Sequence, residues 1–264
     1  MKLEAVKRIG VAAAYKGAGV LLSRFGRVEQ IREKGRNDLV TEADTGAERV
    51  VIETIRRAFP DHGILAEESG QDGGGADGPC WIIDPLDGTT NYAHRLGIFS
   101  ISLAFSLEGE VQVGIVLDPF RGELFSAVCG RGACLNSRPV QVSNAARVAE
   151  SLLVTGFPYN VGAVLDPVMT RFSNCLKAAQ GMRRLGSAAL DLCYVACGRF
   201  DGFWESYLKP WDTAAGVLIL REAGGRATDF ADHPYNGRQS LHLLATNGRI
   251  HQEMVSLLSA EESK

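Results

Sequence analysis

The amino-acid sequence predicts an α+β or layered α/β protein of two lobes that act as one functional unit. Apolar residues recur at helical spacing near both ends of the 264-residue chain, whereas residues 98–142 alternate in the manner of antiparallel strands. Helices that flank mixed and antiparallel strands favour this fold class. We expect the lobes to cover residues 1–145 and 146–264. With 45% hydrophobic residues, the chain can bury one or two large cores without disulfides.

Two amphipathic helices are expected at the start of the N-terminal lobe. The first covers about 25 residues and ends at Gly26, where the helical repeat of apolar side chains stops. The second begins at Thr41, because the spacing Thr41-x-x-Asp44 is typical of a helix N-cap, and it ends at Pro60. Residues 29–38 between the helices are charged and contain a glycine, so we expect an exposed, mobile segment there.

Short apolar strands follow over residues 64–66 and 80–83, and each leads directly into acidic residues. The glycine-rich stretch between them, residues 70–78, is expected to be a flexible surface loop. The remaining expected elements are strands over 99–105, 111–117, 124–128 and 152–155 and helices over 164–179, 187–197 and 210–222. Both early strands therefore carry carboxylates at their ends.

The composition excludes several classes of protein. The 28 basic and 31 acidic residues give a net charge of −3, unlike a dedicated polybasic binder. No apolar run approaches the ~20 residues that cross a bilayer, and the start of the chain lacks the pattern of a secretion signal. The six cysteines form no C-x-x-C pair, which fits reduced thiols. We therefore expect a cytoplasmic protein that binds no membrane and does not bind nucleic acid strongly on its own.

The segment Trp81-Ile-Ile-Asp-Pro-Leu-Asp-Gly-Thr-Thr90 carries a strong chemical signal. An apolar strand ends here in Asp84 and Asp87, and Mg²⁺ is usually held by a few carboxylates of this kind. Gly88 permits close backbone approach, and a helical turn that begins at Thr89 would present free N–H groups to a phosphate. An Asx-type turn, in which the aspartates only cap the chain, is the structural alternative.

Two further acidic residues have comparable settings far away in the sequence. Glu67 follows an expected strand, and Asp212 lies in the first turn of a helix that starts at Pro210. Either carboxylate alone is more typical of a solvated cap than of a metal ligand. Their combination with Asp84 and Asp87 favours a metal site.

Two longer motifs are the most specific feature of the chain. They are Asp84-Pro-Leu-Asp-Gly-Thr-Thr90 and Trp211-Asp-Thr-Ala-Ala-Gly-Val-Leu-Ile-Leu-Arg-Glu-Ala-Gly-Gly225. Together with Glu67-Glu-Ser69 they resemble the inositol monophosphatase family of metal-dependent, lithium-inhibited phosphatases, over nearly the whole chain. The segments Arg183-Arg-Leu-Gly-Ser-Ala-Ala-Leu-Asp-Leu192 and Gly198-Arg-Phe-Asp-Gly-Phe-Trp-Glu205 are similar to those of its bacterial inositol-1-monophosphatase branch. The resemblance implies a layered αβαβα sandwich and a homodimer.

The same resemblance implies a site with two to three Mg²⁺ ions. One ion would be held by Glu67, Asp84 and the carbonyl of Leu86, a second by Asp84, Asp87 and Asp212, and a third, weaker one would lie near Glu67 and Asp44. The implied substrate-binding positions are Leu86, Asp87, Gly88, Thr89, Arg183, Gly186, Ser187, Ala188, Glu205 and Asp212. For two of these the structural alternative stays open, because Ser187 is a good helix N-cap and Glu205 can simply end a strand.

The predicted activity is hydrolysis of myo-inositol 1-phosphate and related phosphate monoesters to the alcohol and inorganic phosphate. The clustered carboxylates would repel a phosphate without cations, so the metals are obligatory in this reading. Two Mg²⁺ ions would activate water and stabilise the leaving alkoxide. Glu67 is the expected base, Thr89 is a proton relay, and Asp44 completes the expected catalytic group.

Other functions remain open. Fructose-1,6-bisphosphatase and other sugar or nucleotide phosphatases of the family would share the metal site, because selectivity between polyols depends on pocket geometry. A hypothesis of a different class is a regulatory binding partner in transcription or ribosome maturation. A phosphatase with an aspartyl nucleophile of the D-x-D type is disfavoured, since the spacing here is D-x-x-D.

Overall fold

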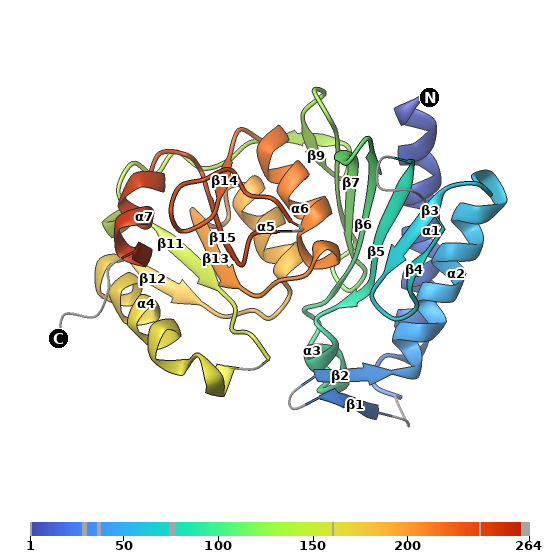
Figure 1. Ribbon diagram of the computed structural model, residues 1–264, viewed down its shortest axis with the longest axis horizontal. Coiled ribbons are helices and arrows are strands. Elements are labelled where there is room, and N and C mark those ends of the chain that lie inside the picture. Colours follow the sequence, from blue (N-terminus) through green and yellow to red (C-terminus); the bar gives the residue numbers. More distant parts are fainter. Residues whose placement is uncertain are drawn as a thin grey trace.

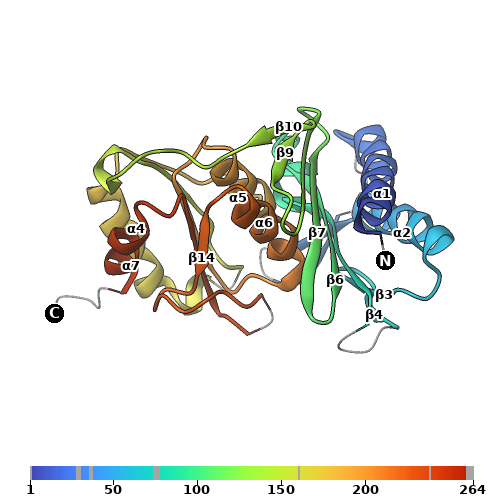
Figure 2. The ribbon, with the colours of Figure 1, turned by 90° about the horizontal axis from the view of Figure 1, so that it is seen from above.

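The computed structural model describes residues 2–27, 31–35, 38–73, 78–159, 161–237 and 239–259. These residues form five layers, in which helices lie outside and between two sheets (Figures 1 and 2). The first sheet is covered by α1 (Leu3–Arg24) and α2 (Glu42–Ala58). Between the sheets lie α5 (Ala188–Ala196) and α6 (Pro210–Glu222), and the second sheet is covered by α4 (Leu165–Ala178) and α7 (His251–Ser259). The expected layered αβαβα sandwich is confirmed.

The first sheet contains eight strands and the predicted antiparallel meander. The strands are β3 (Gly63–Ala66), β4 (Gly70–Asp72), β5 (Cys80–Asp87), β6 (Ser100–Leu107), β7 (Glu110–Asp118), β8 (Glu123–Val128), β9 (Ala133–Leu135) and β10 (Arg138–Val140). Their order is β10-β9-β8-β7-β6-β5-β3-β4, and β3 and β5 are the parallel pair. Because these two strands run in the same direction, the acidic residues that follow them lie at one edge of the sheet.

The second sheet contains five strands, of which the sequence predicted only the first. They are β11 (Leu152–Thr155), β12 (Gly181–Arg183), β13 (Gly202–Ser206), β14 (Arg226–Thr228) and β15 (His242–Thr246), with two short 3₁₀ segments at Val148–Glu150 and Val161–Ala163. The strand order is β12-β11-β13-β15-β14. β11 runs parallel to β12 and β13, whereas β15 runs antiparallel to β13 and β14.

The central strands of both sheets, such as β5 and β13, are buried along their whole length, whereas the edge strands β4 and β10 are largely exposed. Successive side chains of a strand point to opposite faces. Trp81 and Ile83 of β5 therefore pack with α1 and α2, whereas Ile82 between them packs with α5 and α6. In the second sheet, Phe203 faces the same central helices and Trp204 faces α4 and α7. The two helices between the sheets thus sit where segments of both lobes meet.

The predicted helix starts are confirmed. Thr41 accepts a hydrogen bond from Ala43 N–H at 3.1 Å, and its own N–H donates to Asp44 Oδ2 at 2.8 Å, which is a capping box. α6 begins at Pro210, as expected. None of the helices in the described ranges is long and apolar enough to cross a membrane.

Two segments expected to be loops contain strands. β1 (Ile31–Gly35) pairs antiparallel with β2 (Asp38–Thr41), and β4 pairs antiparallel with β3. The loop predictions for residues 29–38 and 70–78 are therefore wrong in part, because backbone hydrogen bonds can form a short ribbon without the apolar side chains that mark a buried strand. Residues 29–30, 36–37 and 74–77 of these predictions lie outside the described residues.

Candidate active site

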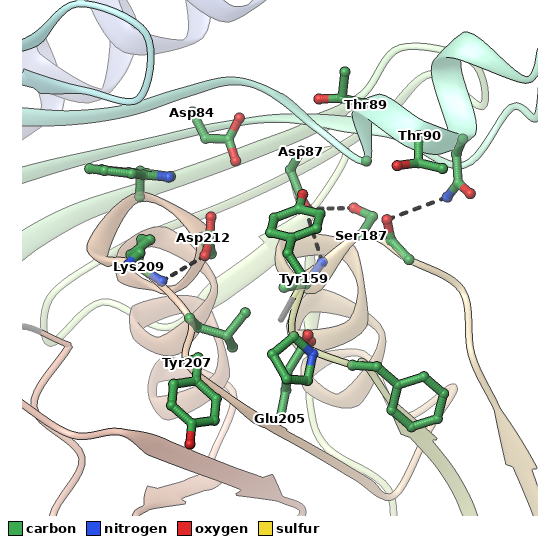
Figure 3. A pocket seen from close by; sticks show the side chains of 18 of the residues that line it. Asp84, Asp87, Thr89, Thr90, Tyr159, Ser187, Glu205, Tyr207, Lys209 and Asp212 are labelled. Carbon is green, nitrogen blue, oxygen red and sulfur yellow. Dashed lines mark hydrogen bonds between the residues drawn. The ribbon is translucent and has the colours of Figure 1, made fainter. Parts of the chain in front are cut away.

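A cavity of about 900 Å³ opens where the ends of β3 and β5 meet the helices between the sheets. Figure 3 shows Asp84, Asp87 and Asp212 around one part of this space, with Glu205 further along it. The predicted site residues that line the cavity are Glu67, Asp84, Leu86, Asp87, Gly88, Thr89, Gly186, Ser187, Ala188, Glu205 and Asp212. The fold thus brings together most of the residues that the sequence singled out.

The end of β5 determines how Asp84 and the following turn are presented. Pairing with β6 is regular up to Asp84 and irregular from there to Asp87, and Leu86 N–H donates to Asp84 Oδ1 at 2.9 Å. Gly88 has a φ of 99°, and α3 (Thr89–Ala93) begins directly after it, as predicted. A Cβ at position 88 would also lie 3.0 Å from a backbone oxygen. Glycine is therefore required in this turn.

Asp87 joins β5 to the start of α5. Its Oδ2 accepts hydrogen bonds from Ser187 Oγ at 2.5 Å and from Ala189 N–H at 2.8 Å, and its Oδ1 accepts one from Ala188 N–H at 3.2 Å. The carboxylate therefore occupies the positive end of the α5 dipole. Ser187 holds the N-cap position, but its side chain makes no capping bond within its own helix. Its hydroxyl donates a hydrogen bond to Asp87 instead.

Asp212 is presented by the first turn of α6. Lys209 N–H donates to Asp212 Oδ2 at 2.7 Å, which fixes the carboxylate at the helix start. Ser102 of β6 donates to the carbonyl of Trp211 at 3.1 Å and ties this helix start to the first sheet. The helix that carries Asp212 is thus anchored next to the strand that carries Asp84.

Glu67 lies directly after β3, and a buried residue of α2 holds the chain in place there. The backbone N–H of Glu67 donates to the carbonyl of Ile83 at 3.1 Å. The carboxylate of Glu48 accepts hydrogen bonds from the N–H groups of Glu68 and Ser69, both at 2.9 Å. Sequence analysis missed Glu48, although a carboxylate on the apolar face of a helix is a usable signal of such a role.

Desolvation and mutual repulsion raise the pKa values of the central aspartates. For Asp84, desolvation is the largest cause, and the charges of Glu67, Asp87 and Asp212 raise its pKa further. Desolvation also raises the pKa of Asp212, while the hydrogen bond from Lys209 opposes this. The pKa of Asp87 is raised by burial and lowered in part by its bonds to the start of α5. Folding therefore brings like charges together at an energetic cost.

This donor set fits hard divalent cations. Carboxylate and carbonyl oxygens are the ligands that Mg²⁺ prefers, and a positive ion would relieve the repulsion between them. Within the described ranges, however, no three acidic, histidine or cysteine side chains already lie at the mutual distances of ligands to one ion. Binding would require side chains such as Asp84 and Asp212 to turn toward a shared centre.

Asp44 does not line the cavity, but it contacts a residue that does. Thr89 Oγ1 lies 3.1 Å from Asp44 Oδ1 and 3.0 Å from the carbonyl oxygen of Leu86, so its single hydrogen is shared between two acceptors. Burial raises the pKa of Asp44, and its hydrogen bonds from Thr41 and Thr89 oppose this rise. Asp44 therefore orients the Thr89 hydroxyl from behind the cavity wall.

Glu205 and Arg184 both line the cavity. Burial raises the pKa of Glu205 to about 8, and the charge of Arg184 opposes this shift. Arg184 lines the cavity, whereas Arg183, which the sequence analysis named, does not. Arg183 ends β12, is exposed, and donates to the carbonyl of Met182 at 2.8 Å. Neighbouring side chains of an extended chain point in opposite directions, which explains why only one of the two arginines lines the cavity.

Other lining residues were also missed. Asn91 Nδ2 donates to the carbonyls of Ile98 and Leu185, both at 2.8 Å, and so connects the turn after β5 to the segment before α5. Its place directly after Thr90 of the first motif was an available signal. Aromatic side chains also line the cavity, namely Phe157, Tyr159, Tyr207 and Trp211. The first three lie in loops without periodic spacing, which leaves no sequence signal.

Comparisons with known proteins agree with this geometry. A model of the inositol monophosphatase family matches residues 2–263. An inositol-1-monophosphatase from Synechocystis sp. is 49% identical over 254 residues, which cover 96% of this chain and 88% of that protein. A Nus factor SuhB from Pasteurella multocida is 43% identical over 94% of this chain and 93% of that protein.

Solved structures give the same result. The inositol monophosphatase from Anabaena (Nostoc) sp. PCC 7120 matches this structure with a TM-score of 0.89 and 43% sequence identity, covering 98% of this chain and 96% of that chain. Fold and sequence therefore agree over nearly the whole chain. The chain is a phosphatase that belongs to the inositol monophosphatase family.

Proposed function

We propose that the protein hydrolyses myo-inositol 1-phosphate and related phosphate monoesters to the alcohol and inorganic phosphate, with Mg²⁺ as cofactor. The observation that carries the proposal is the group of four carboxylates, from Glu67, Asp84, Asp87 and Asp212, in one cavity with Glu205. Asp84 and Asp87 are buried there at 2% and 9% exposure, so a cation is needed to balance them.

The proposed ligands divide into overlapping sets. Glu67, Asp84 and the carbonyl of Leu86 would hold one Mg²⁺, and Asp84, Asp87 and Asp212 would hold a second. A third, weaker ion would lie near Glu67 and Asp44. When bound, Mg²⁺ supplies Lewis-acid activation of water and positive charge for the phosphoryl and leaving oxygens.

The chain's own groups would handle the protons. Glu67 is the proposed base, which takes a proton from the attacking water as its oxygen bonds to phosphorus. The Thr89 hydroxyl donates to Asp44 or Leu86, so its lone pairs are free to accept a hydrogen bond from the same water and align it. The bond from phosphorus to the alcohol oxygen breaks, that oxygen takes up a proton from solvent water, and Glu67 returns its proton to solvent. The step needs no covalent enzyme intermediate.

The substrate would lie along the cavity. The turn over residues 86–89 would face the phosphate, since Gly88 adopts its left-handed conformation without a side chain that would stand in the way. The groups proposed to face the alcohol are Gly186, Ser187, Ala188, Glu205 and, in place of its neighbour, Arg184. A cavity of about 900 Å³ is large for a single sugar-like ring, which supports the acceptance of related monoesters.

Phosphate release tests the proposal. Inositol 1-phosphate, fructose 1,6-bisphosphate and 3′-phosphoadenosine 5′-phosphate are assayed side by side with Mg²⁺, with a chelator, and with added Li⁺. We expect Mg²⁺-dependent, Li⁺-inhibited release that is fastest from inositol 1-phosphate. Preference for the bisphosphate would support the proposed metal site but favour the fructose-1,6-bisphosphatase alternative over an inositol phosphatase. No release from any of the three would contradict the proposal.

We also propose that residues 1–145 and 146–264 form two lobes of one functional unit and that the protein is a homodimer. Support for the first comes from the cavity, which takes Asp84 from one range and Asp212 from the other. Support for the second comes from Leu96 and Phe120, which are 49% and 56% exposed at the ends of the β6–β7 hairpin. Sedimentation equilibrium of the wild type and of Leu96→Asp tests the dimer, and a monomeric wild type would contradict it.

A second candidate function is a regulatory role in transcription. The observation that favours it is the 43% identity to a relative named Nus factor SuhB. The discriminating experiment is complementation of a deletion strain with Asp84→Asn. Rescue by a variant without phosphatase activity would favour the regulatory role, and loss of rescue together with activity would favour catalysis.

A further inference from the structure

The strand pair β11 and β13 places a glycine beside Glu205. The two strands are parallel, and their register pairs Leu153 with Gly202 and Thr155 with Trp204. Continued by one residue beyond the end of β11, this register brings Gly156 next to Glu205. Laterally paired residues of neighbouring strands point to the same face of a sheet. A side chain at position 156 would therefore stand directly beside the side chain of Glu205.

There is no room for such a side chain. A Cβ built at Gly156 would lie 1.9 Å from Glu205 Oε2, 2.2 Å from its Cδ and 2.4 Å from its Oε1. All three atoms belong to the Glu205 carboxyl group. Among the described residues, Gly156 is not one of the glycines with positive φ, so its backbone conformation is open to other residues. The absence of a Cβ at this position is thus explained by the space that Glu205 occupies.

The backbone at Gly156 is not free to move away. Thr155 Oγ1 lies 2.8 Å from the carbonyl oxygen of Trp204 and 3.2 Å from that of Gly156, and its hydroxyl donates to these acceptors. Thr155 and Trp204 are 0% and 1% exposed. This buried bond joins β11 to β13 at the residue before the glycine. If a side chain were added at 156, the end of the Glu205 side chain would therefore yield before the strands did.

We propose that Gly156 is a specificity-determining position, because it leaves the slot that holds the Glu205 carboxyl group against the cavity wall. A substitution at 156 would turn that carboxyl group into the space proposed for the alcohol part of the substrate. The substitution would therefore change the selectivity of the enzyme for the alcohol part of its phosphate-ester substrates. This inference rests on the proposed phosphatase function and deepens it, since it identifies a positioning residue that acts through Glu205.

The test is a double-mutant cycle of Gly156→Ala and Glu205→Asp. Selectivity is measured as the ratio of kcat/KM for inositol 1-phosphate to that for glycerol 2-phosphate, a small acyclic ester. We expect Gly156→Ala to lower this ratio by about tenfold or more, mainly through KM for inositol 1-phosphate. Glu205→Asp withdraws the carboxyl group by one methylene. In the Glu205→Asp background, Gly156→Ala should lower the ratio of kcat/KM values by less than about twofold, because the shorter side chain no longer clashes with the added Cβ.

Gly162→Ala is the matched control, since a Cβ at Gly162 would meet no atom within 4 Å. It should retain the wild-type ratio. The inference is overturned if Gly156→Ala also retains the wild-type ratio, or if its effect is equally large with Glu205 and with Asp at 205. Equal losses on both esters together with a lowered Tm would likewise overturn it, since they would indicate a purely structural role.

A crystal structure of Gly156→Ala separates this inference from the proposed function. We expect the Glu205 carboxyl group to leave its slot while β11 and β13 keep their positions. A carboxyl group that stays in place while the strands shift would overturn the inference. If the wild type released no phosphate from any ester, the proposed function would fail, but the crystal structure would still decide whether Gly156 fixes Glu205.

Discussion

The acidic cavity and the surroundings of His251 are both buried and polar, but they differ in how their groups are partnered. Asp84 and Asp87 are 2% and 9% exposed and face further carboxylates. His251 is 0% exposed, and both ring nitrogens have hydroxyl partners, Thr228 Oγ1 at 2.9 Å and Thr246 Oγ1 at 2.8 Å. Burial and polarity alone therefore do not distinguish a functional cluster from a structural one. The balance of charges and hydrogen bonds does.

The hydroxyl partners of His251 suit a neutral ring, and its Nε2 also lies 3.2 Å from Asp232 Oδ1. Thr228 Oγ1 donates to the carbonyl of Asp229 at 2.7 Å, so it must accept from the Nε2–H of His251. Nδ1 then accepts from the Thr246 hydroxyl. A neutral ring suits both hydroxyl partners, whereas the carboxylates of the cavity repel one another. We expect the His251 region to stabilise the fold and the acidic cavity to reduce its stability until a cation binds.

The largest expected effect comes from removing one charge in the cavity. Asp84→Asn should lower kcat by about 10³-fold or more, because the residue belongs to both proposed ligand sets. The same change should raise the free energy of unfolding of the metal-free protein by about 1 to 2 kcal/mol, because it relieves repulsion among buried carboxylates. Phosphate release and urea unfolding measure the two effects.

Asp61→Asn, at an exposed position, is the control and should change neither quantity. A variant at position 84 that loses stability in the absence of metal would contradict the comparison. In that case the cavity would be a satisfied network like the one around His251.

Metal binding should remove the destabilisation of the acidic cavity, so that it stabilises the fold as the His251 region does. At about 100 times its dissociation constant, Mg²⁺ should stabilise the wild type by about 2.7 kcal/mol, because it binds the folded state and not the unfolded chain. The same Mg²⁺ concentration should have much less effect on Asp84→Asn. Thermal unfolding with Mg²⁺ and with a chelator measures this. Equal shifts in both proteins would argue that the cation binds elsewhere.

The His251 region should respond to acid. Burial lowers the pKa of His251 to about 4, Arg226 adds to this shift, and Asp232 opposes it. The unfolded chain takes up a proton near pH 6.5, so the stabilisation is complete above that pH and is lost as the pH falls toward 4. Between pH 7 and pH 4.5 the loss should be about 2 kcal/mol.

His251→Asn isolates this contribution. The difference in unfolding free energy between wild type and variant should shrink by about 2 kcal/mol over the same pH range, because Asn does not titrate. Urea unfolding at several pH values measures the difference. Parallel pH profiles for the two proteins would show that His251 is not held neutral.

The parts of the site that the sequence predicted are those set by neighbours along the chain. The spacing of Thr41 and Asp44 predicts a capping box, and Pro210 predicts the helix start that presents Asp212, because both signals act within one turn. The turn from Asp84 to Thr89 is equally local. The resemblance to a family then supplied the grouping of these segments, which spacing alone does not give.

The parts that were not predicted depend on contacts across the fold. The bonds of Asp87 to the start of α5 join residues about a hundred positions apart, and no local pattern indicates them. β12 is three residues long, too short to show which of Arg183 and Arg184 faces the cavity. The slot at Gly156 likewise requires knowledge of the register between two strands.

The smallest expected effect is at Asp191, which is buried like His251 but, unlike it, lacks a full set of hydrogen-bond partners. Its side chain is 1% exposed and one carboxyl oxygen has no hydrogen-bond partner, yet it does not line the cavity. Asp118 is a matched control, since it is 0% exposed but accepts from Arg121 N–H at 2.9 Å and Nη1 at 3.0 Å. Asp191→Asn should raise the free energy of unfolding by about 1 kcal/mol, whereas Asp118→Asn should lower it by a similar amount. Urea unfolding measures both changes. If both variants were less stable than the wild type, the lack of a hydrogen-bond partner would not explain the difference between the acidic cavity and the His251 region.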